Sequence, residues 1–158
     1  MILQRSFEVK EFWVPKQTCN FLHQVIMKNA KTLDKGAIMT EWNFAPFMPI
    51  AEWIASKMKE LDNCEERLLV TDVFGQYYKI GHYQEKHDHQ PAHFSFVLFT
   101  NTPEGSSNLC FEDTYIKPET GKVVVFPGDV HHYVPSNKAE NRSVVVGNLQ
   151  YQIREYNS

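Results

Sequence analysis

The sequence predicts a mainly β protein, a jelly roll or barrel with helices at its N-terminus. Two stretches with helical periodicity occupy the first 63 residues, and short runs rich in Val, Phe, Tyr and Thr follow, separated by Gly, Pro or Asn. Because 158 residues suit one domain, we expect a single domain over 1–158. Its helical part would cover about 1–63 and its jelly-roll core about 64–158.

The first predicted helix runs from Val14 to Asp34. Pro15 suits a first turn, and Gly36 suits the point where the helix stops. Apolar residues recur at spacings of three and four and form a stripe of Phe21, Leu22, Val25, Ile26, Ala30 and Leu33. The pattern therefore predicts an amphipathic helix with this stripe in the core.

The second predicted helix follows Pro46 and Pro49. Its apolar stripe consists of Ile50, Trp53, Ile54, Met58 and Leu61, and its charged residues lie off the stripe. Aromatic residues in such a stripe usually belong to a core. We expect both helices to pack on the outside of one sheet as a buttress.

The remaining sequence predicts antiparallel strands. The candidate strands are Leu68 to Tyr78, Phe94 to Thr100, Asn108 to Phe111, Val123 to Phe126, His132 to Val134 and Ser143 to Tyr151. Six or more short strands of this kind favour a jelly roll or a barrel.

Composition and charge exclude several classes of protein. Hydrophobic residues make up 42% and charged residues 22%, which is typical of a folded globular chain. A net charge of -3 argues against a nucleic acid partner. No run approaches the roughly 20 apolar residues that span a bilayer, and the N-terminus does not resemble a signal peptide. We therefore expect no membrane partner and a cytoplasmic location.

The three cysteines, Cys19, Cys64 and Cys110, are far apart and odd in number. This spacing suits neither a disulfide framework nor a structural zinc site. We expect each to act as a small buried hydrophobic residue.

Histidines cluster in one part of the chain, with six of the seven between positions 82 and 132. In a strand, His87 and His89 would point to the same side while Asp88 points away. His132 follows a predicted strand and turn, and antiparallel packing could bring it against this pair. Three convergent imidazoles with open positions suit a redox metal, so we predict a metal site at these three histidines. The others in this region, His82, His93 and His131, are expected to be structural or exposed.

Arg142 lies at the start of the last predicted strand, on the same side as Val144, Val146 and Asn148. If that side faces the interior, the guanidinium group would be buried without a partner. An unpaired buried charge is costly, and the planar guanidinium group suits a carboxylate. The position therefore indicates an anionic ligand.

These motifs resemble the Fe(II)/2-oxoglutarate-dependent dioxygenases, especially the prolyl 4-hydroxylase type and the small oxygenases related to it. Tyr78 and Gly81 form a Tyr-x-x-Gly motif before His87, and Arg142 follows His132 by ten residues. The resemblance implies a double-stranded β-helix, the jelly roll of this superfamily, buttressed by two or more helices. It covers a little over half of the chain, from about position 68 to 149.

The resemblance also implies an activity. Fe(II) would be the metal and 2-oxoglutarate the cosubstrate, with Arg142 on its distal carboxylate and the Tyr78 hydroxyl as a further contact. The product would be a hydroxylated substrate, with succinate and CO₂ released. The substrate, a small molecule or a peptide, is unidentified, and a prolyl residue is suggested only by analogy. No catalytic residue beyond the metal site is implied, and the oligomeric state is left open.

The chain departs from the family pattern at three positions. His89 stands where the family usually has Asp or Glu, so the third metal ligand could be His89, Asp88 or an exogenous group. Val144 replaces a frequent Ser, and Phe99 replaces a frequent Tyr. An inactive relative that only binds a ligand is therefore one alternative.

A second alternative is a cupin-like metal-dependent dioxygenase or binding module that does not use 2-oxoglutarate. Gly81 followed by His87-x-His89, and Pro127 followed by His132, match parts of the two cupin motifs. The glutamate expected after His89 is missing, and Arg142 has no role in a typical cupin. We therefore favour the oxoglutarate-dependent reading.

Overall fold

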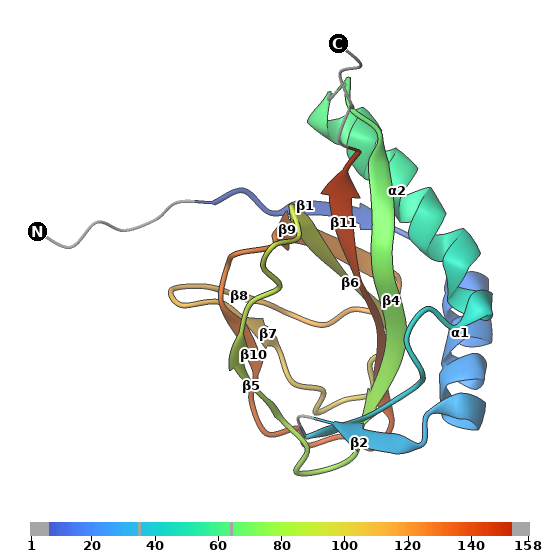
Figure 1. Cartoon of the computed structure of the whole chain (residues 1–158). Helices are drawn as coiled ribbons and strands as arrows, with labels where there is room; N and C mark the ends of the chain where they lie inside the picture. The colour runs from blue at the N-terminus through green and yellow to red at the C-terminus, as the bar shows by residue number, and fades with distance from the viewer. Residues whose placement is uncertain (1–6, 35, 64, 153–158) are drawn as a thin grey trace, which may run out of the picture.

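A computed structural model describes residues 7–34, 36–63 and 65–152. Its strands form two sheets, all pairs antiparallel, and two helices cover the outer face of the larger sheet (Figure 1). The prediction of a mainly β fold with N-terminal helices is confirmed.

The helices are α1 (Lys16–Asn29) and α2 (Met48–Asp62), with a short 3-10 turn η1 (Ala45–Phe47) before α2. The strands are β1 (Lys10–Trp13), β2 (Thr32–Asp34), β3 (Ala37–Met39), β4 (Leu68–Tyr78), β5 (Gln84–His87), β6 (Phe94–Asn101), β7 (Leu109–Cys110), β8 (Tyr115–Ile116), β9 (Lys122–Pro127), β10 (His132–Val134) and β11 (Arg142–Tyr151). Among the described residues, the larger sheet has the order β1-β9-β6-β11-β4-β3-β2 and the smaller one the order β5-β10-β7-β8.

The larger sheet is buried on both faces, which explains its continuous valine runs. Val145 on β11 packs into the core beneath the helices together with Ile26 and Ile54. Its neighbours Val144 and Val146 point to the other face and pack in a second core between the two sheets. The side chains that point into the space between the sheets are therefore alternate residues of each strand.

The first helix is shorter than predicted, because the stretch from Val14 to Asp34 divides into a helix and a strand. The helix ends when Ala30 adopts an extended conformation, and the Lys31 amide then donates to the Met39 carbonyl. Gly36, with a φ of 93°, lies in the turn between β2 and β3 instead of stopping a helix.

Part of the predicted apolar stripes is exposed. Leu33 is 67% exposed because it belongs to β2, and Phe21 is 59% exposed on α1. On α2, Trp53 and Leu61 are also exposed, although the Trp53 ring packs edge-on against Phe12 with 5.7 Å between centroids. The prediction that these four side chains belong to the core was wrong.

All six predicted strands occur, and the short or polar strands were missed. β5 has the sequence Gln-Glu-Lys-His, without an apolar residue, and β1 buries only Phe12. Cys19 is buried as expected, Cys110 is half-buried, and both are free. Cys64 lies outside the described residues. Neither described helix is long and apolar enough to cross a membrane.

Candidate metal centre

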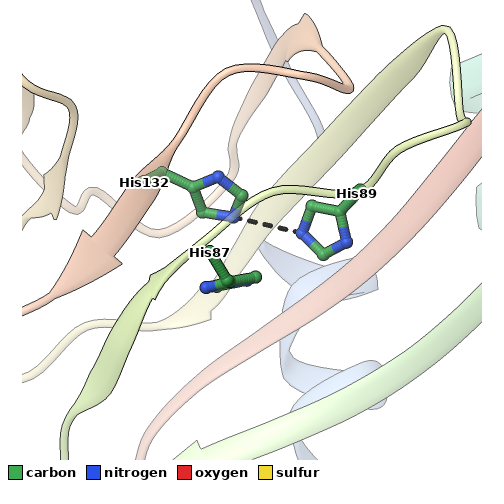
Figure 2. A group of neighbouring side chains, drawn as sticks. All are labelled: His87, His89 and His132. Atoms are coloured by element: carbon green, nitrogen blue, oxygen red, sulfur yellow. Dashed lines mark hydrogen bonds between the residues drawn. The ribbon is translucent and has the colours of Figure 1, made fainter.

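Three histidines from the smaller sheet meet at one point. His87 ends β5 and pairs directly with His132 at the start of β10, while His89 lies two residues beyond β5. Figure 2 shows the three rings around a common centre. Their centroids are 4.2 Å apart for His87 and His132 and 4.9 Å apart for the other two pairs. One ligand nitrogen from each lies within 4.8 Å of the others.

The hydrogen bonds of two rings fix which nitrogen is free to bind a metal. The Nδ1 atoms of His132 and His87 lie 3.1 and 2.8 Å from the carbonyl oxygens of Val130 and Glu85. Because a carbonyl oxygen only accepts, Nδ1 must donate in both rings. The lone pair of each neutral ring is then on Nε2, and metal-binding histidines commonly have this arrangement, with the other ring nitrogen donating to a carbonyl or carboxylate.

The separation of the ring nitrogens also suits a metal ion. His132 Nε2 lies 3.1 Å from His89 Nε2, the contact drawn dashed in Figure 2. Two ligand nitrogens held at about 2.1 Å from one ion and at right angles to each other are about 3 Å apart. The three side chains therefore fit a metal ion that keeps open positions for other ligands.

Burial keeps His132 in the form that binds metals. The ring is 3% exposed and packs against Phe126, with 4.8 Å between centroids. Burial, followed by the charge of His87, lowers the pKa of His132 to about 3. His132 is therefore neutral at physiological pH.

Asp88, the alternative ligand, bonds to residues outside the histidine cluster. Its carboxylate accepts from the Gln90 amide at 3.2 Å and pairs with His131 Nε2 at 3.0 Å. His82 and His93 also lie outside the metal cluster, where each accepts a hydrogen bond from a backbone amide through Nδ1. The geometry therefore favours His89 over Asp88 as the third ligand.

Arg142 is buried, as are Val144, Val146 and Asn148, so the side of the strand that these residues were expected to share faces the interior. Arg142 is 1% exposed, and its Nε donates to the Ser107 carbonyl at 3.0 Å. Its guanidinium carbon lies 4.6 Å from the Tyr78 ring centre and 5.6 Å from that of Phe99. Burial lowers the pKa of Arg142. Among the described residues, its NH1 nitrogen has no hydrogen-bond partner.

One cavity between the sheets connects Arg142 with the histidines. About 360 Å³ around these residues is free of protein atoms, part of it open to solvent, and the centre of a water-sized sphere can move through about 20 Å³. Its lining residues are Phe74, Gln76, Tyr78, Gln84, His87, His89, Val97, Leu109, His132, Val134, Arg142, Val144 and Val146. The cavity therefore brings together all five predicted site residues. It has a cationic end at Arg142 and a wall of imidazoles.

Two glutamines in this cavity were missed by the sequence analysis. The Tyr78 hydroxyl lies 3.1 Å from Gln84 Oε1 and 3.3 Å from Gln76 Oε1, and burial raises its pKa. Gln76 has the same strand phase as Tyr78, which was an available signal. A polar residue in a strand, however, usually faces solvent.

No family model and no curated protein match this chain. Solved structures do match. The chain is similar to the viral collagen prolyl hydroxylase of Paramecium Bursaria Chlorella virus-1 in its 2OG complex, at 17% identity and a TM-score of 0.70, covering 92% of this chain and 96% of that one. It is also similar to a Pseudomonas putida prolyl-4-hydroxylase, at 16% identity and a TM-score of 0.65, covering 91% and 92%.

The chain has the fold of the 2-oxoglutarate–Fe(II) oxygenases. A member of that family from Burkholderia pseudomallei matches at 11% identity and a TM-score of 0.68, over 84% of this chain and 77% of the other. The expected jelly roll buttressed by helices is thereby confirmed. Of the two other departures from the family pattern, Val144 lines the cavity and Phe99 packs against Arg142.

Proposed function

We propose that this protein is an Fe(II)- and 2-oxoglutarate-dependent oxygenase that hydroxylates its substrate and releases succinate and CO₂. The observation that supports this most is the unpartnered NH1 donor of buried Arg142, in the same cavity as His87, His89 and His132. A dicarboxylate that binds a metal through one end and Arg142 through the other would satisfy both features. The similarity in fold to 2-oxoglutarate-dependent oxygenases is consistent with this proposal.

In this proposal the residues divide into two groups. His87, His89 and His132 hold Fe(II) through their Nε2 atoms, and Arg142 binds the distal carboxylate of 2-oxoglutarate. The Tyr78 hydroxyl donates toward Gln84 and Gln76 Oε1 in this structure, and on ligand binding it would turn its single proton to the same carboxylate. Bound iron and cosubstrate would together supply the oxidising chemistry that inserts oxygen into a C–H bond.

The protein's own contribution is binding, orientation and exclusion of water. Much of the cavity wall is apolar, including Val97, Val144 and Leu109. Such a wall leaves water few partners and strengthens the interaction of a bound carboxylate with Arg142. No separate general base is needed, so we assign no catalytic residue beyond the metal site.

We also propose that the protein acts in the cytoplasm. Cys19 and Cys110 are free, and structural disulfides are rare in reducing compartments.

Anaerobic titration of Fe(II) and 2-oxoglutarate into metal-free protein tests the proposed function. A visible metal-to-ligand charge-transfer band that weakens in Arg142→Ala would support it. Iron binding without this band would favour a cupin-like or purely metal-binding protein. Failure of the wild-type protein to bind iron would overturn the proposal.

A further inference from the structure

The inner face of the larger sheet presents its side chains in four rows. Each row contains one residue of β4 and its paired residue on β11. The second, third and fourth rows also contain the paired residue of β6. In order, the rows are Tyr78–Arg142, Gln76–Val144–Phe99, Phe74–Val146–Val97 and Asp72–Asn148–Ser95. The first row lies at the arginine end of the cavity, and the fourth lies at the opposite end of the same face.

The fourth row is polar and internally hydrogen-bonded. Ser95 Oγ donates to Asn148 Oδ1 at 2.7 Å, and Asn148 Nδ2 donates to Asp72 Oδ2. Ser95 and Asn148 are buried, while Asp72 is half-buried. The second bond orients the carboxylate of Asp72, and the first orients the Asn148 amide that donates it. The other carboxylate oxygen of Asp72, Oδ1, has no hydrogen-bond partner among the described residues.

An exposed indole lies on the same face of β4 as this carboxylate. The Asn43 backbone N–H donates to the Val73 carbonyl at 2.7 Å, and the Val73 N–H donates to Asn43 Oδ1 at 2.9 Å. The chain around Asn43 therefore runs alongside β4 at Val73, the residue after Asp72. Trp42, which precedes Asn43, packs against the Phe74 ring of the third row with 4.8 Å between centroids. Trp42 nevertheless remains 56% exposed. A large aromatic surface is thus left open beside Phe74, which lies two residues from Asp72 on the same face of β4.

The position of the fourth row relative to the metal ligands points to a role in recognition. Phe74 and Val146 of the third row line the cavity together with the three histidines. Asn148 lies six residues from Arg142, which is about 20 Å along an extended strand. If 2-oxoglutarate occupies the cavity between Arg142 and the metal, the substrate must reach the metal from elsewhere. The opposite end, with Asp72 and Trp42, is such a side.

We propose that Asp72 and Trp42 bind a cationic group of the substrate, an amine or a guanidinium. The free oxygen of an oriented carboxylate forms a charge-assisted hydrogen bond with such a group, and an indole face attracts a cation. The assignment of this group to the substrate rests on the proposed function. The cation site itself can be tested without turnover.

The test is an NMR titration of the full chain, with and without Zn(II) and 2-oxoglutarate, that follows the tryptophan indole N–H signals. The probes are the N-acetyl N-methylamides of lysine, arginine, norleucine and glutamate. We expect the lysine or arginine probe to shift the Trp42 signal, identified by its loss in Trp42→Phe. The norleucine and glutamate probes should bind at least about tenfold more weakly.

Asp72→Asn supplies the decisive comparison, because it keeps an acceptor for Asn148 and removes only the charge. We expect it to weaken the cationic probe about tenfold. Asp113→Asn, on an exposed loop between β7 and β8, removes the same charge elsewhere and should leave affinity unchanged. Thermal unfolding of both variants checks that the fold is retained.

Three results would overturn the inference: no binding of either cationic probe, equal binding of the norleucine probe, or unchanged affinity in folded Asp72→Asn. Titration of the same samples with 2-oxoglutarate separates this result from the proposed function. If the protein binds 2-oxoglutarate but neither cationic probe, only the cation site is overturned. If it binds a cationic probe but not 2-oxoglutarate, the proposed function is overturned and the cation site is retained.

Discussion

Arg142 and Tyr78 face each other across β11 and β4, with the guanidinium carbon 4.6 Å from the centre of the phenol ring. Phe99 covers the same guanidinium at 5.6 Å, and no carboxylate pairs with it among the described residues. Aromatic faces compensate only part of the cost of burying a cation. The structure therefore contains a buried charge that the dicarboxylate of the proposed function would stabilise.

Replacing Arg142 with methionine should separate stability from cosubstrate binding. Since a buried charge without an ion-pair partner destabilises a fold, we expect Arg142→Met to leave the free energy of unfolding unchanged or raise it by about 1–2 kcal/mol. Addition of 2-oxoglutarate with Mn(II) should raise the melting temperature of the wild-type protein but not that of the variant. Equal stabilisation of both proteins by 2-oxoglutarate would contradict the role given to Arg142.

Alanine substitution can distinguish the proposed metal ligands from the neighbouring Asp88. His132→Ala removes a buried imidazole from the cluster, so we expect Co(II) affinity to fall by roughly a hundredfold or more. Asp88→Ala should change it little, because the Asp88 carboxylate bonds to Gln90 and His131. Visible Co(II) absorption measures both affinities.

His89→Asp tests the third position directly. Aspartate restores the usual carboxylate of the oxygenase family, so this variant should retain metal. Loss of the metal in Asp88→Ala together with unchanged binding in a His89→Ala variant would reassign the third ligand.

Tyr78→Phe should weaken cosubstrate binding without disturbing the cavity. The ring still stacks on Arg142, and only the hydroxyl bonded to Gln84 is lost. We expect the Kd for 2-oxoglutarate to rise about five- to tenfold, the effect of one hydrogen bond to a charged group. Calorimetric titration in the presence of Mn(II) measures it, and Tyr77→Phe on the opposite face of β4 is the matched control.

The long apolar strands were predictable because hydrophobic alternation records burial on a sheet. The segment from Leu68 to Tyr78 was identified with the bounds that the structure shows. In contrast, β5 forms because β10 pairs with it, a long-range contact that its polar sequence does not encode. The histidines were recognisable from their spacing, whereas the Asp72–Asn148–Ser95 row joins residues up to 76 positions apart in the chain. Only the strand register brings them together.

Stability should depend on pH through His23, a residue of α1 whose Nδ1 lies 2.7 Å from Ser143 Oγ on β11. Burial lowers its pKa below the ordinary value of 6.5, so the unfolded chain binds protons more readily. The contribution of His23 is complete above pH 6.5 and is lost as pH falls through that value toward the lower pKa of the folded state. Urea unfolding between pH 5 and 8 should show this loss.

His23→Asn isolates this contribution. We expect a shallower loss of stability on acidification in the variant, with the remainder coming from His132, whose pKa is lowered in the same direction. If the free energy of unfolding depends on pH identically in the two proteins, His23 does not contribute to the loss of stability on acidification.

At Gly75 the helical layer approaches the sheet closely. A β-carbon at this position of β4 would lie 2.6 Å from Ile26 Cγ1 and 2.9 Å from Phe47 Cζ, and both side chains are fully buried. Neither can move away without disturbing the core, so we expect Gly75→Ala to lower the free energy of unfolding by about 1–3 kcal/mol.

Ile26→Ala removes the nearest atom and by itself lowers the free energy of unfolding by about 2–5 kcal/mol. In the double variant the new methyl group occupies part of that space, and the loss should therefore be smaller than the sum of the two single losses. Urea unfolding of the four proteins measures this coupling, and strict additivity would show that the contact with Ile26 does not limit the packing of α1 on β4.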